Sequence, residues 1–170
     1  MEKKILFVPI VLLALAALPI ACTLEGTSEV EFAKELMKES AEATKDASGL
    51  EPQSEASKDS FTVGEGLTIE WPQEAPPEGE PYRITLTFEH YVPECAPSST
   101  VNGALTADVW FVWVEEPAGW TLTIHFQGDL TVTGEHAGHY RYDAHLTVEP
   151  SGEYSNSGEL TIDGTVYQTG

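Results

Sequence analysis

The sequence has few positive charges, and six of its eight lie within the first 60 residues. The 170 residues contain 8 Lys and Arg against 28 Asp and Glu, a formal net charge of −20. From residue 61 onward the only Lys or Arg side chains are Arg83 and Arg141. Such a domain repels phosphate backbones, which excludes nucleic-acid binding. The acidity favours a solubilising surface and leaves open the capture of a cationic ligand or calcium.

Cysteines and catalytic motifs are also scarce. The two cysteines, Cys22 and Cys95, allow one disulfide at most, and it would join a flexible leader to a loop and constrain little of the fold. Cys95 lies in a proline-flanked loop without a recognisable histidine motif, so a catalytic role is not favoured. There is no G-x-S-x-G, P-loop, H-E-x-x-H or EF-hand motif. The sequence therefore predicts no cofactor and identifies no reaction.

The N-terminus is typical of an export signal. Residues 1–4 contain Lys3 and Lys4, and residues 5–21 follow without a charge. Pro9 and Pro19 interrupt this apolar run, which is near the minimum length for a spanning helix. A short basic flank and a proline-broken apolar run suit a cleaved signal peptide over residues 1–21. Polar residues break every later apolar run.

The end of this segment, Leu18-Pro19-Ile20-Ala21-Cys22, resembles the lipobox of a bacterial lipoprotein precursor. The resemblance implies cleavage before Cys22 and attachment of palmitate and other acyl chains to it. Several chains at about 0.8 kcal/mol per buried CH₂ form a stable membrane anchor. Pro19 stands where the family usually has Leu or a small residue, so ordinary secretory cleavage near Ala16 or Ala21 is the alternative. Thr23, where an inner-membrane retention signal would have Asp, permits the outer membrane or cell surface.

Residues 22–60 have the composition of an acidic tether, rich in Ala, Ser, Glu, Thr and Lys. Within it, Ser28 and Glu31 have the spacing of a capping box, and apolar residues then recur at helical spacing. The stripe is thin and mostly alanine, which predicts a marginal helix near residues 29–47. We expect the tether to hold the following domain clear of the bilayer.

From residue 61 to residue 170 the hydrophobic period changes to two, which indicates β-strands. Six alternating runs are separated by Pro- and Gly-rich turns, including one run that bends around residues 64–66 and a last one with Leu160, Ile162 and Val166. Short connections favour an all-β, antiparallel six-stranded meander. Because one apolar face must be covered, we expect a curled sheet or open barrel, or a sandwich; the helix is a possible cover.

Three further patterns refine the strands. Trp110, Val112 and Val114 make the second face of one strand apolar, so we predict that this strand is central or covered on both faces. Gly128 predicts a bend or bulge in another. A G-x-L-T motif recurs at residues 103–106, 128–131 and 158–161, which suggests one design reused along the sheet.

The candidate site residues are histidines, acids and aromatic residues. Glu135, His136 and His139 share a hairpin tip, where two imidazoles and a carboxylate can hold zinc or copper. His125 and His145 lie on adjacent predicted strands. If the residue numbers of each pair in this hairpin add up to 272, the two histidines lie diagonally on one face. The simpler interpretation is that both are ordinary exposed strand residues. Exposed aromatic residues such as Trp110 and Tyr91 are candidates for a carbohydrate or protein contact, or for ordinary packing.

These features predict a membrane-anchored extracytoplasmic lipoprotein with a non-catalytic binding or envelope-structural role. Its expected partners are the membrane, through the lipid, and an envelope protein or a cationic ligand. The alternative is a metal-dependent or hydrolytic enzyme that uses His136, His139 and nearby acids.

Overall fold

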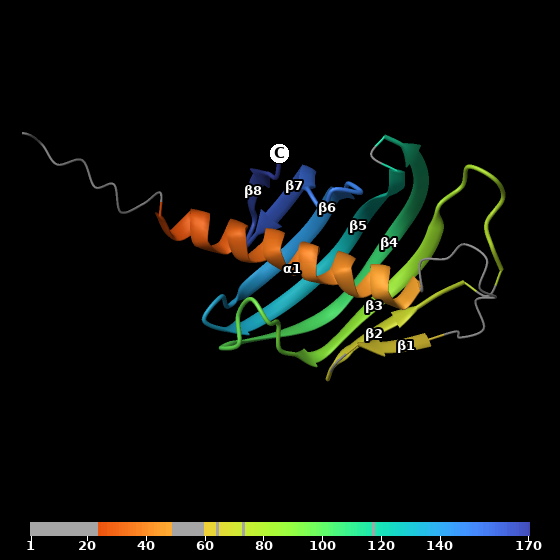
Figure 1. The fold of residues 1–170 in the computed structure, drawn as a ribbon. Helices are drawn as coiled ribbons and strands as arrows, with labels where there is room; N and C mark the ends of the chain where they lie inside the picture. The colour runs from red at the N-terminus through yellow and green to blue at the C-terminus, as the bar shows by residue number, and fades with distance from the viewer. Residues whose placement is uncertain (1–23, 49–59, 64, 73, 117) are drawn as a thin grey trace, which may run out of the picture.

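The computed structural model describes residues 24–48, 60–63, 65–72, 74–116 and 118–170. The predicted signal sequence, Cys22 and the second part of the tether lie outside these ranges. The described chain forms one helix and eight strands: α1 (Leu24–Ser48), β1 (Ser60–Val63), β2 (Leu67–Glu70), β3 (Tyr82–Tyr91), β4 (Ser99–Glu115), β5 (Ala118–Gly134), β6 (Gly138–Val148), β7 (Tyr154–Ile162) and β8 (Thr165–Gln168) (Figure 1).

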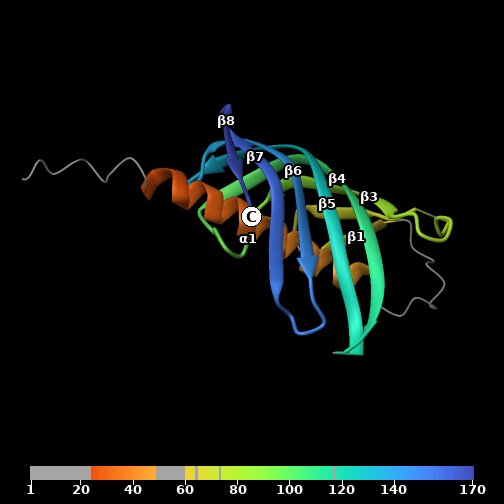
Figure 2. The ribbon, with the colours of Figure 1, turned by 90° about the horizontal axis from the view of Figure 1, so that it is seen from above.

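The strands form a single antiparallel sheet in sequence order, β1 to β8, with each strand paired to the one before it. The sheet curves, and α1 lies across its concave side (Figures 1 and 2). The predicted all-β antiparallel meander is therefore confirmed. It is one curled sheet and not a sandwich, because α1, and not a second sheet, covers the concave face. Within the described ranges, no helix is both long enough and apolar enough to cross a membrane.

The sheet has eight strands because both terminal runs of the predicted meander are hairpins. The first run forms β1 and β2, paired from Ser60↔Glu70 to Val63↔Leu67, where we predicted one bent strand. The last run is divided by a two-residue turn at Asp163 and Gly164, both with positive φ. Because this turn reverses the chain, Val166 points away from the core and is 57% exposed. A two-residue turn shifts the inward positions by one residue, so the spacing of Leu160, Ile162 and Val166 in the sequence does not show which face Val166 occupies.

The helix belongs to the packed domain. Phe32, Ala33, Leu36, Met37 and Ala41 are buried in one cluster with the concave face of the sheet. The predicted apolar stripe is thus correct, but the helix is not part of a free tether. The packed unit begins at α1 and not at residue 61, because the concave face of the sheet buries a stripe that is too thin to stabilise a helix alone.

Three glutamates of α1 add polar contacts to this packing. The hydroxyl of Tyr140 donates to Glu29 Oε2 over 2.6 Å, and that of Tyr154 donates to Glu42 Oε1 over 2.7 Å. The hydroxyl of Tyr91 donates to Glu39 Oε1 in the same way. Burial, and then the bond to Glu42, raise the pKa of Tyr154 to about 12, so this phenol remains a hydrogen-bond donor at neutral pH. The three bonds come from β6, β7 and β3 and define the position of the helix.

The glycines of the G-x-L-T motif share one structural role. Gly103, Gly128 and Gly158 all have positive φ, between 115° and 143°. A Cβ at Gly128 would lie 2.6 Å from the carbonyl oxygen of Ala104 on the neighbouring strand, and the other two positions are as close to a carbonyl. Pairing of β4 with β5 is continuous through Gly128, so the predicted bulge is absent. The motif instead marks close approach between strands of the curved sheet.

Replacement of a buried α1 side chain is expected to destabilise the whole domain. Leu36→Ala leaves a cavity between helix and sheet and is expected to lower the free energy of unfolding by about 2–5 kcal/mol. Glu35→Ala, at the preceding and exposed position, is the matched control. It is expected to change the free energy of unfolding by less than about 0.5 kcal/mol. Urea denaturation followed by tryptophan fluorescence measures both. Equal, small effects of the two substitutions would contradict the packing of α1 described above.

Candidate binding site

The end of the β4–β5 hairpin extends past the strand on one side of it. Both strands have 17 residues and remain paired as far as Glu115↔Ala118. On the other side of β4, pairing with β3 ends at Tyr82↔Val109. We call residues 110–116 and 118–121 the aromatic hairpin; its turn stands at the top of Figure 1.

Aromatic side chains follow the concave side of this end of the sheet. Trp71 and Tyr82 have ring centroids 5.9 Å apart, and Tyr82 and Phe111 have the same separation, all in edge contacts. Further along the hairpin, the rings of Trp113 and Trp120 meet at 5.3 Å. Edge contacts of this kind stabilise aromatic pairs beyond the area that they bury.

Two large apolar side chains of the hairpin face solvent, while its other aromatic residues are half-buried. Trp113 is 53% exposed and Val112 54% exposed, on opposite faces of β4. The prediction of a central strand is confirmed, because β4 lies between β3 and β5, but its two-sided apolar part is not covered, since it lies where β3 has ended. The indole N–H of Trp71 is buried and has no hydrogen-bond partner in the described structure. Of the two aromatic residues that we predicted to be exposed, Tyr91 is buried and Trp110 is half-buried, whereas Trp113 is exposed.

The charges around the hairpin are negative. Glu115 and Glu116 stand at its turn, and no Lys or Arg occurs between Arg83 and Arg141. Glu149, in the neighbouring β6–β7 turn, accepts a hydrogen bond from the hydroxyl of Thr121 over 3.2 Å. An apolar, acidic surface of this kind attracts cations and repels other acidic molecules.

The structure does not bring together the three predicted metal ligands. His136 Nδ1 lies 3.1 Å from Glu29 Oε2, and its ring stacks on Phe32 with 4.5 Å between centroids. His139 Nε2 lies 3.4 Å from Asp129 Oδ1 instead. Glu135 is exposed. Among the described residues, no group of three or more His, Cys, Asp or Glu side chains has the geometry to hold a metal ion. His136 acts as a packing residue at the N-terminal end of α1.

Cys95 lies in the β3–β4 loop, close to Glu39 of α1. Burial and the neighbouring carboxylate raise the pKa of the Cys95 thiol to about 11. A thiol with such a pKa stays protonated at neutral pH, which makes it a poor nucleophile. Cys95 is a free cysteine, and its possible partner Cys22 lies outside the described residues.

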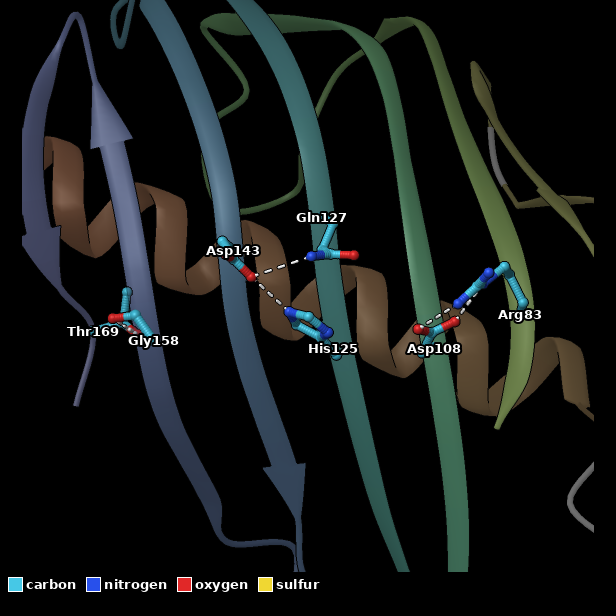
Figure 3. Close-up of polar contacts among 7 residues, drawn as sticks. All are labelled: Arg83, Asp108, His125, Gln127, Asp143, Gly158 and Thr169. Atoms are coloured by element: carbon cyan, nitrogen blue, oxygen red, sulfur yellow. Dashed lines mark hydrogen bonds and ion pairs between the residues drawn. The ribbon is translucent and has the colours of Figure 1, made fainter. Parts of the chain in front are cut away.

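His125 and His145 face each other directly on the convex side of the sheet. Their residue numbers add up to 270, and not to the expected 272, because β6 is shifted by two residues along β5. The rings stack with centroids 4.1 Å apart. Figure 3 shows the contact of His125 with Asp143, in which Nε2 lies 2.7 Å from Oδ1. Burial, and then the charge of His125, lower the pKa of His145. The hydrogen bond from His125 lowers the pKa of Asp143.

The same convex surface contains Arg83, whose Nε and Nη2 donate to Asp108 over 2.7 and 3.0 Å (Figure 3). Arg141 Nε similarly donates to Asp129 Oδ1 over 2.9 Å. Both arginines of the sheet are thus engaged by aspartates of neighbouring strands. The hydrogen bond from Arg83 lowers the pKa of Asp108. This surface consists of cross-strand ion pairs and contains few apolar side chains.

An open pocket of about 430 Å³ lies beside β3, lined by Pro76, Pro77, Glu80, Pro81 and Arg83. It contains no histidine or cysteine, and its single arginine is bound to Asp108. It therefore lacks a nucleophile paired with a base.

The chain was compared with protein-family models, curated proteins and solved structures, and it matches none of them.

The histidine pair predicts a dependence of stability on pH. Because the folded state holds the pKa of His145 below its ordinary value, the unfolded chain binds this proton first as the pH decreases. This contribution to stability is therefore present above the ordinary histidine pKa of 6.5 and is lost below it. His145→Gln is expected to flatten the change in urea midpoint between about pH 7.5 and 5.5. Gln127→Ala, beside the same Asp143 but without a titrating ring, is expected to retain the wild-type slope; a wild-type slope in His145→Gln would contradict this assignment.

Proposed function

We propose that the chain is a lipid-anchored extracytoplasmic protein whose β domain binds a partner through the aromatic hairpin and catalyses no reaction. The observation that carries the binding role is the exposure of Trp113 and Val112 in the segment of β4 that extends past the end of β3. Exposed large apolar side chains that cluster on one structural element are typical of interaction sites.

The non-catalytic part of the proposal is supported by how the reactive groups are engaged. His136 contacts Glu29 and packs on Phe32, while His139 contacts Asp129. The raised pKa of Cys95 opposes thiolate chemistry. These side chains satisfy one another and do not converge on a substrate.

The lipid anchor is supported by the sequence that ends at Cys22. The position of α1 indicates which end of the domain such an anchor would hold at the membrane. Only Thr23 separates Cys22 from the first residue of α1. The N-terminal end of α1 contacts the β5–β6 turn through Glu29 and His136. A lipid on Cys22 would hold this end of the domain at the bilayer directly, in place of the long tether that we expected from composition.

The aromatic hairpin lies at the opposite end of β5 from this turn. The 17 residues of β5 separate the two ends by up to about 55 Å along the strand, at about 3.3 Å per residue. The proposed orientation therefore directs Trp113 away from the anchoring membrane, toward a partner in the envelope or outside the cell.

Replacement of the proposed lipid attachment residue tests the anchor. Cys22→Ala is expected to move the protein from the membrane fraction and to leave the uncleaved precursor, because both cleavage and acylation need this cysteine in the lipoprotein class. Metabolic labelling with a palmitate analogue is expected to mark the wild type alone. Cys95→Ala is the matched control and is expected to retain labelling and membrane fractionation. A Cys22→Ala protein that matures and stays on the membrane would refute the lipid anchor.

Site-specific cross-linking in the producing cell tests the binding role of the hairpin. A photoreactive amino acid at position 113 is expected to give a discrete covalent adduct, because this position contacts the partner. The same amino acid at the exposed Thr131, near the other end of β5, is the control and is expected to give none. Adducts of the same size and yield at both positions would show that the hairpin is not the binding surface.

A further inference from the structure

The β4 edge of the aromatic hairpin has no strand beside it. Residues 110–115 pair with β5 on one side, and on the other side β3 ends opposite Val109. The described backbone hydrogen bonds outside helices and strands include none from these residues. Their outward N–H and C=O groups therefore form a free sheet edge about six residues long, which can accept another strand.

The β5 side of the same hairpin is partly covered by the β6–β7 turn, although pairing of β5 with β6 ends at Leu122↔Val148. A Cβ at Gly119 would lie 2.6 Å from Cβ of Pro150, so the β6–β7 turn lies against this strand. The bond between Thr121 and Glu149 fixes the turn there. The β4 edge is therefore the more accessible of the two for an added strand.

This edge lacks the features with which proteins commonly prevent strand addition. Exposed edges usually contain lysines, prolines or bulges that oppose pairing. Residues 110–115 read Trp-Phe-Val-Trp-Val-Glu, so five of the six are apolar and none is basic or proline. Their pairing with β5 is regular, without a bulge. The edge is suited to pairing.

The charges indicate which strand fits. Glu115 and Glu116 border the edge, Glu149 flanks the hairpin, and Arg83 is engaged by Asp108. A second copy of this chain brings its own net charge of −20, which disfavours self-association. A basic strand complements the acids, and its side chains can also lie over the rings of Trp110 or Trp113 in cation–π contacts.

We infer that the free β4 edge of the aromatic hairpin binds an extended, basic segment of a partner protein as an added antiparallel or parallel strand. This inference rests on the proposed function of the hairpin as the binding site and specifies its ligand. Main-chain hydrogen bonds to residues 110–115 supply affinity, while the acids and indole rings select a basic, partly apolar sequence.

Defined peptides test this inference on the full chain held in nanodiscs of neutral phosphatidylcholine. The probe is an eight-residue peptide of alternating Lys and Val with blocked ends. Two matched peptides replace Lys by Glu, or carry a methyl group on every backbone nitrogen and so cannot donate to a strand. Tryptophan fluorescence and calorimetry are expected to detect binding of the Lys-Val peptide, at least about tenfold tighter than that of either control.

Two variants with the same charge change locate the site. Val112→Lys places a charge on the free edge and is expected to weaken binding of the Lys-Val peptide at least about tenfold. Thr131→Lys changes the net charge equally at a distant exposed position of β5 and is expected to weaken it less than about threefold. A circular dichroism spectrum and urea midpoint like those of the wild type verify that each variant is folded.

Three results would overturn the inference. Equal affinity for the N-methylated peptide would exclude strand pairing, and equal weakening by the two variants would exclude the β4 edge as the location. Concentration-dependent dimers that Val112→Lys abolishes would identify a second copy as the occupant. If position 113 still cross-links in the cell when any of these results is obtained, the hairpin remains a binding site and only the class of its partner is wrong.

Discussion

The concave face of the sheet is apolar from β2 to β7, and α1 is the element that removes most of it from water. Phe32, Leu36 and Met37 supply the large side chains of this contact, and alanines at positions 33 and 41 let the helix approach the strands closely. Burial of apolar area is the dominant favourable term in folding, so an uncovered concave face would leave the sheet marginal. Apolar burial is not directional, so it does not fix the position of the helix along the sheet; the three tyrosine–glutamate hydrogen bonds do. The remaining features of the domain depend on this covered sheet.

Because α1 covers the concave face, the exposed apolar residues at the end of the β4–β5 hairpin are conspicuous. The convex face contains cross-strand ion pairs and the stacked histidines, whose polar groups bind one another. Among the residues that the structure describes, an exposed tryptophan, an unpaired backbone edge and uncompensated acids occur together at the hairpin alone. The same helix also fixes the end of the domain that follows Cys22, so the proposed anchor and the proposed binding surface lie at opposite ends of one rigid sheet.

Much of the fold could be predicted from local patterns. Alternation identified the inward faces of β3 to β6, and the turns between them were marked by Pro and Gly. The G-x-L-T motif was visible in the sequence, but its role was not, since a positive φ beside a neighbouring carbonyl depends on the curvature of the paired strands. The hairpins at both ends of the sheet were not divided into two strands, because the three-residue turn between β1 and β2 preserves the period-two pattern and the last run was extended across Asp163 and Gly164 to Val166. The two-sided apolar segment predicted a strand that is central or covered on both faces. β4 is central, but the segment is exposed, since a pattern reports which side chains are apolar and not whether a neighbouring strand continues beside them.

By itself, the sequence determined the acidic charge, the antiparallel meander and the amphipathic helix, whereas the export signal and the lipid anchor stay predictions. Each of these depends on composition or on spacing within a few residues of the chain. Only the tertiary structure decided that the helix belongs to the core, that His136 and His139 contact different acids, and that β4 extends past β3. These features depend on where chain segments far apart in sequence end relative to one another. Strand length and register arise from the packing of the whole sheet, and no short stretch of sequence encodes them.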